Sequence, residues 1–493
     1  MNRMKRKLGI LSVMKAKMVR LPLIQTILYW RSLRRPYLYI NRIRLSRAAY
    51  RHHCLYDPQI QKRIDDKKRR GEPLHVVFVL HEPKFYGSVA STINCLRKDS
   101  RFKVTLMATP CRGATSVSGG YHDGGVKAFL EKLGVPYIDA VQADGSFRDI
   151  RGLKPDFVFF QQPYVDVLFK GIYDIREIST YSFLAYIPYD GINTSHRLRY
   201  VVTWQPFFSF AHFAFFATAN ARKELTTLVP NVEKTINAYC IGCPKFESLV
   251  RGVSDEESAW QMVDPENKVF RVLWAPRWTP DESHHFMDLW RPLLNWAQAH
   301  PKTVEFVFRP HPAMFAEYLK QGFMTEHELD DLKSAFAQSP NTHIDNLPFF
   351  EKTYSMTDLV ISEPGTSMCI LFVPYNKPII CTVGKGTYKD VTAYIKNIMK
   401  GLYCSCSVET TMELVEKLRS GWRDEEKERL HTNFANELLA PLRGKPFAEH
   451  VRDALMQDAP PCAKELHHTK ALVDQRWLIR VVSMNSKVVF TPI

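Results

Sequence analysis

Short, continuous apolar runs alternate with amphipathic stretches along this chain, in two successive series. The first series opens at 75–80 and the second at 269–274, with a polar stretch, 254–267, between them. Apolar strands that alternate with helices are typical of a parallel sheet covered by helices on both faces. We therefore predict an α/β fold with two doubly wound, Rossmann-like domains that face a cleft.

The same patterns predict individual elements. The expected strands are 75–80, 103–108, 136–138, 156–160, 183–187 and 213–217, then 269–274, 304–308, 342–344, 358–361 and 378–382. The expected helices are 86–96, 124–133, 220–228, 283–300, 312–319, 326–337, 348–355, one that opens at Thr366, 410–418, 425–439 and 446–456. We expect the last of these helices to return to the first domain.

These patterns divide the chain into four parts. They are a basic helical arm at 1–72, a first domain at 73–253, a second domain at 268–444, and a closing helix with a tail at 445–493. Because 493 residues exceed what one hydrophobic core usually serves, two domains are also expected from length alone.

The net charge of +16 is confined to the arm. Residues 1–72 hold 20 Lys and Arg and four acidic residues, whereas the remaining 421 residues hold 47 of each sign. The arm mixes its basic residues with apolar ones, a pattern typical of helices that lie in an anionic membrane surface. The alternatives are a solvated charged helix and a nucleic-acid-binding arm. Aromatic residues are interleaved with basic ones only at 30–39, so we expect no nucleic-acid partner.

No run of eighteen apolar residues is present, so no transmembrane helix is expected. The basic start has no small-residue cleavage site, which argues against a secretory signal. Ten cysteines are too few for a disulfide scaffold, and we expect Cys240 and Cys243 to be ordinary buried thiols. The predicted location is the cytoplasm, at the inner face of the cell membrane.

Motifs for dinucleotide oxidoreductases, P-loop enzymes, zinc proteases and serine hydrolases are absent from the sequence. No metal-binding motif is present either, so we expect neither a metal ion nor a cofactor. Polar residues instead follow the strands of the second series, where open α/β sheets bind their ligands. We predict that the following residues bind a donor molecule: Arg277, Arg309, Ser362, Glu363, Gly365, Thr366 and Ser367.

Each of these candidates has a plainer alternative. Arg277 follows a strand and can bind phosphate, or it can be a surface arginine. Thr366 and Ser367 open a helix, where hydroxyls and N–H groups can bind an anion or simply cap the helix. His311 lies between Pro310 and Pro312, which fix the backbone around it, so we predict a site residue, with a structural capping histidine as the alternative.

Two residues of the first domain are candidates for the general base. Asp190 follows the apolar run 183–187 and precedes a glycine, so it can face the cleft as a carboxylate base or form an ordinary Asp-Gly turn. His81 follows the first strand and is the second candidate.

Several segments together resemble the CDP-glycerol glycerophosphotransferase family, whose members have the GT-B fold. The matching segments are Lys154–Pro163 (KPDFVFFQQP), Ile241–Glu247 (IGCPKFE), Arg309–Pro312 (RPHP) and Asp358–Ser367 (DLVISEPGTS). The resemblance implies a catalytic role for His311 and donor binding by Glu363 and the hydroxyls after it. The family has Asp where this chain has Glu363, and its Trp-His-Gly motif corresponds here to Tyr189-Asp190-Gly191.

The resemblance implies transfer of glycerol phosphate, or a related polyol phosphate, from a CDP-activated donor to a cell-surface polymer or lipid-linked acceptor, as in teichoic-acid or capsule synthesis. Because a carboxylate base such as Asp190 suits inverting sugar transfer, the alternative is a glycosyltransferase that uses a nucleotide sugar in capsule or lipopolysaccharide synthesis. The expected partners are the nucleotide-activated donor, the acceptor and an anionic membrane surface.

Overall fold

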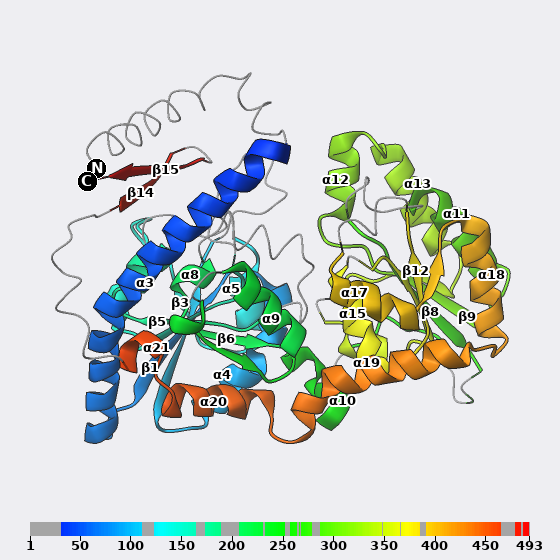
Figure 1. Ribbon diagram of the computed structural model, residues 1–493. Coiled ribbons are helices and arrows are strands. Elements are labelled where there is room, and N and C mark those ends of the chain that lie inside the picture. The colour runs from blue at the N-terminus through cyan, green and yellow to red at the C-terminus, as the bar shows by residue number, and fades with distance from the viewer. Residues whose placement is uncertain are drawn as a thin grey trace.

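The protein consists of two α/β units, as seen in the computed structural model (Figure 1). The structure describes residues 31–110, 123–163, 173–188, 207–229, 232–251, 257–263, 266, 268–278, 286–347, 349–364, 366–384, 391–464, 479–484 and 487–492.

The first unit is built on a seven-stranded sheet with the order β3-β2-β1-β4-β5-β6-β7. All neighbouring strands in it are parallel. The strands are β1 (Leu74–Leu80), β2 (Phe102–Ala108), β3 (Ile138–Asp139), β4 (Phe157–Phe160), β5 (Phe183–Tyr186), β6 (Phe213–Phe216) and β7 (Asn237–Cys240).

The second unit is built on a six-stranded parallel sheet with the order β10-β9-β8-β11-β12-β13. Its strands are β8 (Phe270–Ala275), β9 (Val304–Phe308), β10 (Thr342–Ile344), β11 (Leu359–Ser362), β12 (Ile379–Thr382) and β13 (Tyr403–Ser405). In both sheets the chain begins at a central strand and adds strands out to one edge. It then returns to the middle and adds strands out to the other edge. This doubly wound topology is the one that the sequence predicts.

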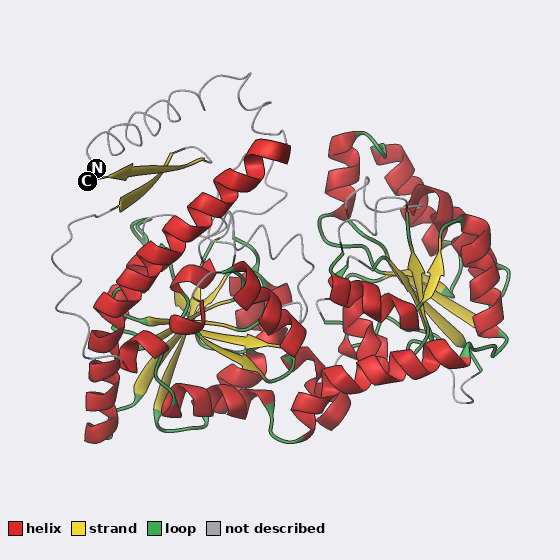
Figure 2. Ribbon diagram, in the orientation of Figure 1, coloured by secondary structure: helices red, strands yellow, loops and turns green. Residues whose placement is uncertain are grey.

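Helices flank both sheets (Figure 2). Those of the first unit are α3 (Arg31–Arg70), η1 (Pro83–Ser88), α4 (Ala90–Arg97), α5 (Val126–Lys132), η2 (Ile150–Leu153), α6 (Ile175–Ile178), α8 (Phe207–Phe210), α9 (Ala219–Leu228), η3 (Val232–Lys234), η4 (Pro244–Phe246) and α10 (Glu247–Arg251). Those of the second are α11 (Phe286–Gln298), α12 (Met314–Gln321), α13 (Glu326–Ala337), α14 (Glu351–Ser355), α15 (Ser367–Phe372), η5 (Val373–Tyr375), α17 (Ala393–Ile398), η6 (Met399–Gly401), α18 (Val408–Arg419) and α19 (Glu425–Arg443).

Strand β1 shows why the predicted strands are continuously apolar. Val76 and Phe78 belong to one buried cluster, while Val77 and Val79 belong to another on the opposite face of the sheet. Successive strand residues point to opposite faces, so a strand covered on both faces needs an apolar side chain at every position.

The second half of α3 is packed onto the first unit. Ile60 and Ile64 lie in its core. Lys67 and Arg63 form ion pairs with the fully buried carboxylate of Asp156, with N–O distances of 2.6 and 3.2 Å. Part of the basic segment 1–72 is therefore a structural element of the first domain, which differs from the separate arm that we expected.

The chain returns to the first unit after α19. Helix α20 (Phe447–Gln457) packs against α4, and the short α21 (Pro461–Lys464) packs against α3. Phe447 meets the ring of Phe215, and the Tyr239 hydroxyl donates a 2.6 Å hydrogen bond to Asp458. The sequence predicted this return. Beyond it, β14 (Ile479–Met484) and β15 (Lys487–Pro492) form an antiparallel pair.

Within the described residues, no helix is both long and apolar enough to span a bilayer.

Gly242 sits where α19 meets the loop after β7. It has a φ of +92°, and an added Cβ would lie 2.7 Å from Leu442 of α19. Leu442 is fully buried. The glycine in the Ile241–Glu247 segment is therefore required both by its backbone angle and by the close approach of this helix.

We predict that Gly242→Ala lowers the free energy of unfolding by about 3 kcal/mol, because it combines a strained backbone with overpacking. Chemical denaturation with far-UV circular dichroism measures the change. Gly444→Ala is the matched control, since a Cβ at Gly444, which directly follows α19, meets nothing within 4 Å and its φ is −84°. Equal stabilities of the two variants would contradict this account.

Candidate functional site

In the second sheet, the chain adds strands in one direction from β8 and in the other direction from β11, so the switch point lies between these two central strands. Val360, Ile361 and Ser362 of β11 pair with Leu273, Trp274 and Ala275 of β8, so both strands end at the same level. Open parallel sheets bind ligands at such a switch point, beyond the carboxyl ends of the strands. Arg277 follows β8 and Glu363 follows β11, which places two predicted donor-binding residues there.

Glu363 joins the two loops at this switch point. The residue is 2% exposed, and its Oε2 accepts a 2.6 Å hydrogen bond from the backbone N–H of Arg277. A buried carboxylate needs such donors to offset its lost hydration. Glu363 therefore fixes the backbone from which the Arg277 side chain extends.

The hydroxyls after β11 stabilise the same turn. Ser362 Oγ donates to the carbonyl of Ala275 at 2.6 Å and lies 2.9 Å from Thr366 Oγ1. Thr366 caps α15 by accepting a hydrogen bond from the Cys369 N–H at 3.1 Å. The structure thus gives Thr366 the capping role named above as its alternative. Ser367 is the first residue of α15, and Gly365 lies outside the described residues.

His311 lies near this switch point, after β9, and its ring is oriented by two contacts. Nδ1 accepts a 3.1 Å hydrogen bond from the Ala313 N–H, so the neutral ring carries its proton on Nε2. Trp278, three residues beyond the end of β8, stacks on the imidazole with a ring-centroid separation of 5.7 Å. His311 is exposed.

Arg309 is directed toward the interior of its own domain. Its guanidinium forms an ion pair with Asp345 and donates to the carbonyls of Leu347 (2.9 Å) and Phe349 (3.4 Å). The side chain is 14% exposed. These contacts shape the loop after β10, which reaches the first unit through a ring contact between Phe349 and Phe129 (6.1 Å).

His81 is buried at the corresponding switch point of the first sheet, between β1 and β4. Gln161, which follows β4, accepts a 2.8 Å hydrogen bond from the His81 backbone N–H. Both ring nitrogens of His81 lack a partner among the described residues. Burial lowers the pKa of His81 to about 3, so the ring is neutral at pH 7 and is a weak base. Asp190, the other candidate base, lies outside the described residues.

Three residues that organise these sites were not among the predicted site residues: Gln161, Trp278 and Asp345. Trp278 had a usable signal, because it is an aromatic residue near the end of a buried strand. Gln161 and Asp345 interact with residues about 80 and 36 positions away in the chain, and sequence spacing does not reveal such pairs.

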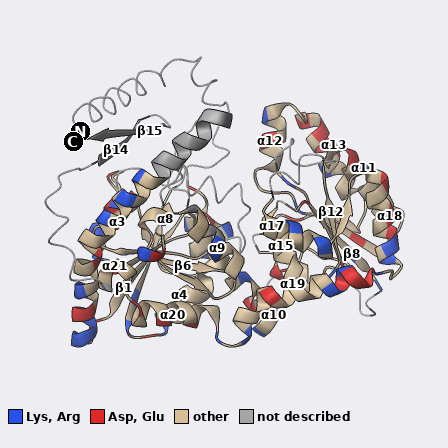
Figure 3. Cartoon of the chain, viewed as in Figure 1, with Lys and Arg blue, Asp and Glu red and all other residues tan. Residues whose placement is uncertain are grey.

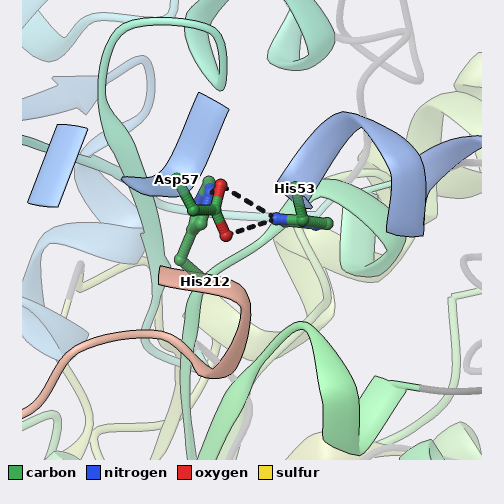
Figure 4. A group of neighbouring side chains, drawn as sticks. All are labelled: His53, Asp57 and His212. Atoms are coloured by element: carbon green, nitrogen blue, oxygen red, sulfur yellow. Dashed lines mark hydrogen bonds and ion pairs between the residues drawn. The ribbon is translucent and has the colours of Figure 1, made fainter. Parts of the chain in front are cut away.

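His53, Asp57 and His212 form a buried polar cluster between α3 and the start of β6 (Figure 4). His53 Nδ1 lies 3.0 Å from one Asp57 oxygen, and His212 Nε2 lies 3.0 Å from the other. His53 Nε2 donates to the Ser209 carbonyl at 3.0 Å. The sequence patterns did not predict this cluster.

Among the described residues, this is the one group of His, Cys and acidic side chains close enough to hold a metal ion. The hydrogen bonds argue against that use. His212 Nδ1 accepts the Leu184 N–H at 2.9 Å, so the proton of the neutral ring must be on Nε2, the atom that faces Asp57. A protonated nitrogen has no lone pair for a metal. The cluster is instead a hydrogen-bonded latch between α3 and the sheet, called the α3 latch below.

The pKa shifts agree with a charged latch. Burial alone would raise the pKa of Asp57, but the charge and hydrogen bonds of the two histidines outweigh it and lower the pKa to about 2. Burial opposes protonation of His53, yet Asp57 raises its pKa above the usual 6.5. Burial lowers the pKa of His212, which stays neutral. The latch is therefore an Asp57 anion that lies between two imidazole rings, of which His212 is neutral.

We predict that Asp57→Asn destabilises the protein by about 3 kcal/mol at pH 7, because it removes the buried anion that hydrogen-bonds to both histidines. Asp57 has a depressed pKa, so its stabilisation is present above pH 3.8 and is lost as the pH falls toward 2. The difference between wild type and variant in denaturant titrations should therefore shrink over that range.

Asp65→Asn is the control, since Asp65 is an exposed carboxylate on the same helix. If this substitution destabilises the protein as much as Asp57→Asn, or if the Asp57 effect is independent of pH, the α3 latch does not act as described.

Two solved structures show the same overall fold. One is a putative UDP-N-acetylglucosamine 2-epimerase from Listeria monocytogenes, with 12% sequence identity and a TM-score of 0.51 over 78% of this chain and 97% of that chain. The other is S. aureus MnaA in a co-structure with UDP, with 12% identity and a TM-score of 0.50 over 78% of this chain and 96% of that one. The chain has a GT-B-like fold, with two parallel Rossmann-like sheets, as the sequence predicted.

A scan against protein-family models gives no match, and a search of curated protein sequences gives none. The resemblance to the CDP-glycerol glycerophosphotransferase family therefore stays a prediction based on the segments quoted above.

Proposed function

We propose that this protein is a transferase that binds a nucleotide-activated donor at the β8–β11 switch point and transfers the activated group to an acceptor hydroxyl. The observation that carries the proposal is the arrangement at this point. A buried carboxylate, Glu363, orients the loop of Arg277, and Trp278 from that loop orients His311 beside it. An arginine and a histidine N–H held in this way suit the phosphates of a nucleotide.

CDP-glycerol is the first candidate donor, because the segments that contain His311 and Glu363 resemble the glycerophosphotransferase family. The acceptor hydroxyl would attack the phosphorus that bears glycerol, and the bond from this phosphorus to the bridging oxygen would break. CMP leaves with the electron pair of that bond, and the general base takes the hydroxyl proton. We assign the base to Asp190, since buried His81 has a pKa of about 3.

The residues after the second-domain strands then have distinct roles. His311 donates its Nε2–H to the leaving phosphate, and Arg277 neutralises the charge that develops there. Arg309 acts as a positioning residue through Asp345, since its guanidinium is engaged within the domain. Ser362 and Thr366 brace the turn, from which Gly365 and Ser367 contact the donor.

A sugar from a nucleotide sugar is the second candidate for the transferred group. Two observations favour it: S. aureus MnaA, which shares the fold, has been solved in a co-structure with UDP, and Asp190 is a carboxylate of the kind that inverting sugar transfer uses. In that reaction the hydroxyl attacks the anomeric carbon, and the nucleoside diphosphate leaves.

Titration of the purified chain with CDP-glycerol and with a panel of UDP-sugars, followed by tryptophan fluorescence, tests the donor without needing an acceptor. Trp278 is stacked on His311 at the proposed site and supplies a local signal. The first candidate predicts tightest binding of CDP-glycerol and, with acceptor, release of CMP. Release of UDP or UMP without CMP would contradict it and favour sugar transfer. Conversion of UDP-N-acetylglucosamine to an epimer without any acceptor would contradict both.

We predict that His311→Ala lowers the rate of transfer about 100-fold or more and changes donor affinity by only several-fold, because the lost hydrogen bond serves the transition state. Initial rates at saturating donor measure the effect. His327→Ala is the control, since His327 is 82% exposed on α13 of the same domain. An unchanged rate would remove His311 from the mechanism.

We also propose that the N-terminal part of the chain holds the enzyme at an anionic membrane surface. Figure 3 shows Lys and Arg at intervals along α3, but Arg63 and Lys67 are paired with Asp156. We therefore assign the membrane contact to residues 1–30, which contain seven Lys and Arg and no acidic residue. Each basic residue near such a surface contributes about 1 kcal/mol of attraction.

Removal of residues 1–30 should abolish sedimentation with phosphatidylglycerol vesicles and leave the folded domains intact, because it retains Leu45, Ala49, Ile60 and Ile64, through which α3 packs into the core. The full chain should sediment with these vesicles at low salt and stay in solution with phosphatidylcholine vesicles. Equal sedimentation of the full and shortened chains would contradict the membrane role of this segment.

A further inference from the structure

A cavity of about 500 Å³ lies in the first domain, at the carboxyl ends of β2 and β3. Ala108, the last residue of β2, pairs with Leu80 of β1 and with Asp139 of β3. The cavity is therefore beside the switch point of the first sheet, one strand away from His81. Its lining includes Thr109, Asp123, Lys127, Asp139, Gln142 and Phe147.

One wall of the cavity is a tight, internally bonded turn. Val141 and Phe147 form an antiparallel bridge, and the Gln142 N–H donates to the Ser146 carbonyl at 2.8 Å. Asp144 accepts from the Ser146 N–H at 2.9 Å, and Gly145 closes the turn with a φ of +79°. Gln142 and Phe147 are thereby presented from a pre-formed backbone, as in most small-molecule sites.

The lining also carries one ammonium group beside two carboxylates. Lys127 Nζ lies 3.0 Å from Asp139 Oδ2 and 4.0 Å from Asp123 Oδ2. The hydrogen bond to Asp139 raises the pKa of Lys127, so the amine stays charged at neutral pH. The three groups together have a net charge of −1, which disfavours a phosphate or another anion.

Hydroxyl groups fit this arrangement well. A hydroxyl donates one hydrogen bond and accepts others, so two adjacent hydroxyls can donate to Asp139 and accept from Lys127 at once. Phe147 offers an apolar surface for the C–H groups between them. The cavity volume lies within the range of small-molecule sites.

We propose that this cavity binds an uncharged, hydroxyl-rich unit, a sugar or polyol, that belongs to the acceptor. The inference rests on the proposed transferase function and adds to it the chemical class of the acceptor. The cavity lies beside the first-domain switch point. When a unit of the acceptor is bound in it, the rest of the acceptor extends past the carboxyl ends of the strands. Asp139, Lys127 and Phe147 are its binding residues.

Saturation-transfer NMR with the full chain tests the proposal. The probes are ribitol, glycerol and methyl α-glucoside, each titrated to about 50 mM because isolated units bind weakly. Glycerol 3-phosphate and glucose 6-phosphate are the charged counterparts. We expect at least one neutral probe to bind and both phosphates to bind more weakly.

Asp139→Asn should weaken binding of the neutral probe about tenfold, since it removes a charge-assisted hydrogen bond and loosens Lys127. Asp144→Asn is the matched control: it makes the same change of charge on the turn that forms the wall, but Asp144 does not line the cavity. The control should leave probe affinity unchanged, and both variants should retain the wild-type circular dichroism spectrum.

Three results would overturn the assignment: no neutral probe binds, Asp139→Asn binds the neutral probe as wild type does, or a phosphate binds more tightly than its neutral counterpart. CDP and UDP are titrated into the same samples. If wild type binds neither CDP nor UDP, the proposed donor site is contradicted, while the result for the cavity is unaffected. Nucleotide binding without probe binding contradicts only the acceptor class.

Discussion

Burial of both sheets on both faces is the constraint on which the rest of the structure depends. Strands such as β1 have no solvent-facing side, so polar side chains are displaced to the loops beyond the strand ends. In a parallel sheet the carboxyl ends of all strands lie on the same side, so the polar groups of the following loops lie close together there. Glu363, Arg277 and His311 are adjacent for this reason, although 86 residues separate the first two in sequence.

The polar groups that remain inside the fold are satisfied by several partners each. Asp156 accepts from Lys67, Arg63 and the His75 N–H, and the α3 latch surrounds Asp57 with two histidines. A buried carboxylate is stable only with such compensation. Both clusters fasten α3 to the first sheet, so part of the basic charge near the N-terminus is structural. The charge available for a membrane is accordingly smaller than the net +16 suggests.

Sequence patterns predicted most strands of the two sheets and missed the edge strands β7 and β13. The edge strands β7 and β13 contain Asn237 and Ser405, and their mixed composition gave no strand signal. Helix ends were also predictable where a capping hydroxyl is present, as at Thr366. The direction of a side chain was not predictable. Arg309 and Arg277 both follow strands, yet Arg309 turns toward Asp345, a residue 36 positions later whose place depends on the packing of β10 beside β9.

The engagement of Arg309 has a mechanical consequence for a two-domain enzyme. The guanidinium fixes the loop 345–350 to the end of β9, the strand that precedes His311. The same loop contacts the first domain, where Phe349 meets Phe129 and Lys245 lies 5.3 Å from the ring centroid of Phe350. Phe129 belongs to α5, the helix that also carries Lys127. A chain of contacts therefore extends from the loop that bears His311, through Arg309 and Phe349, to the helix that lines the first-domain cavity, so the two sites are linked across the contact between the domains.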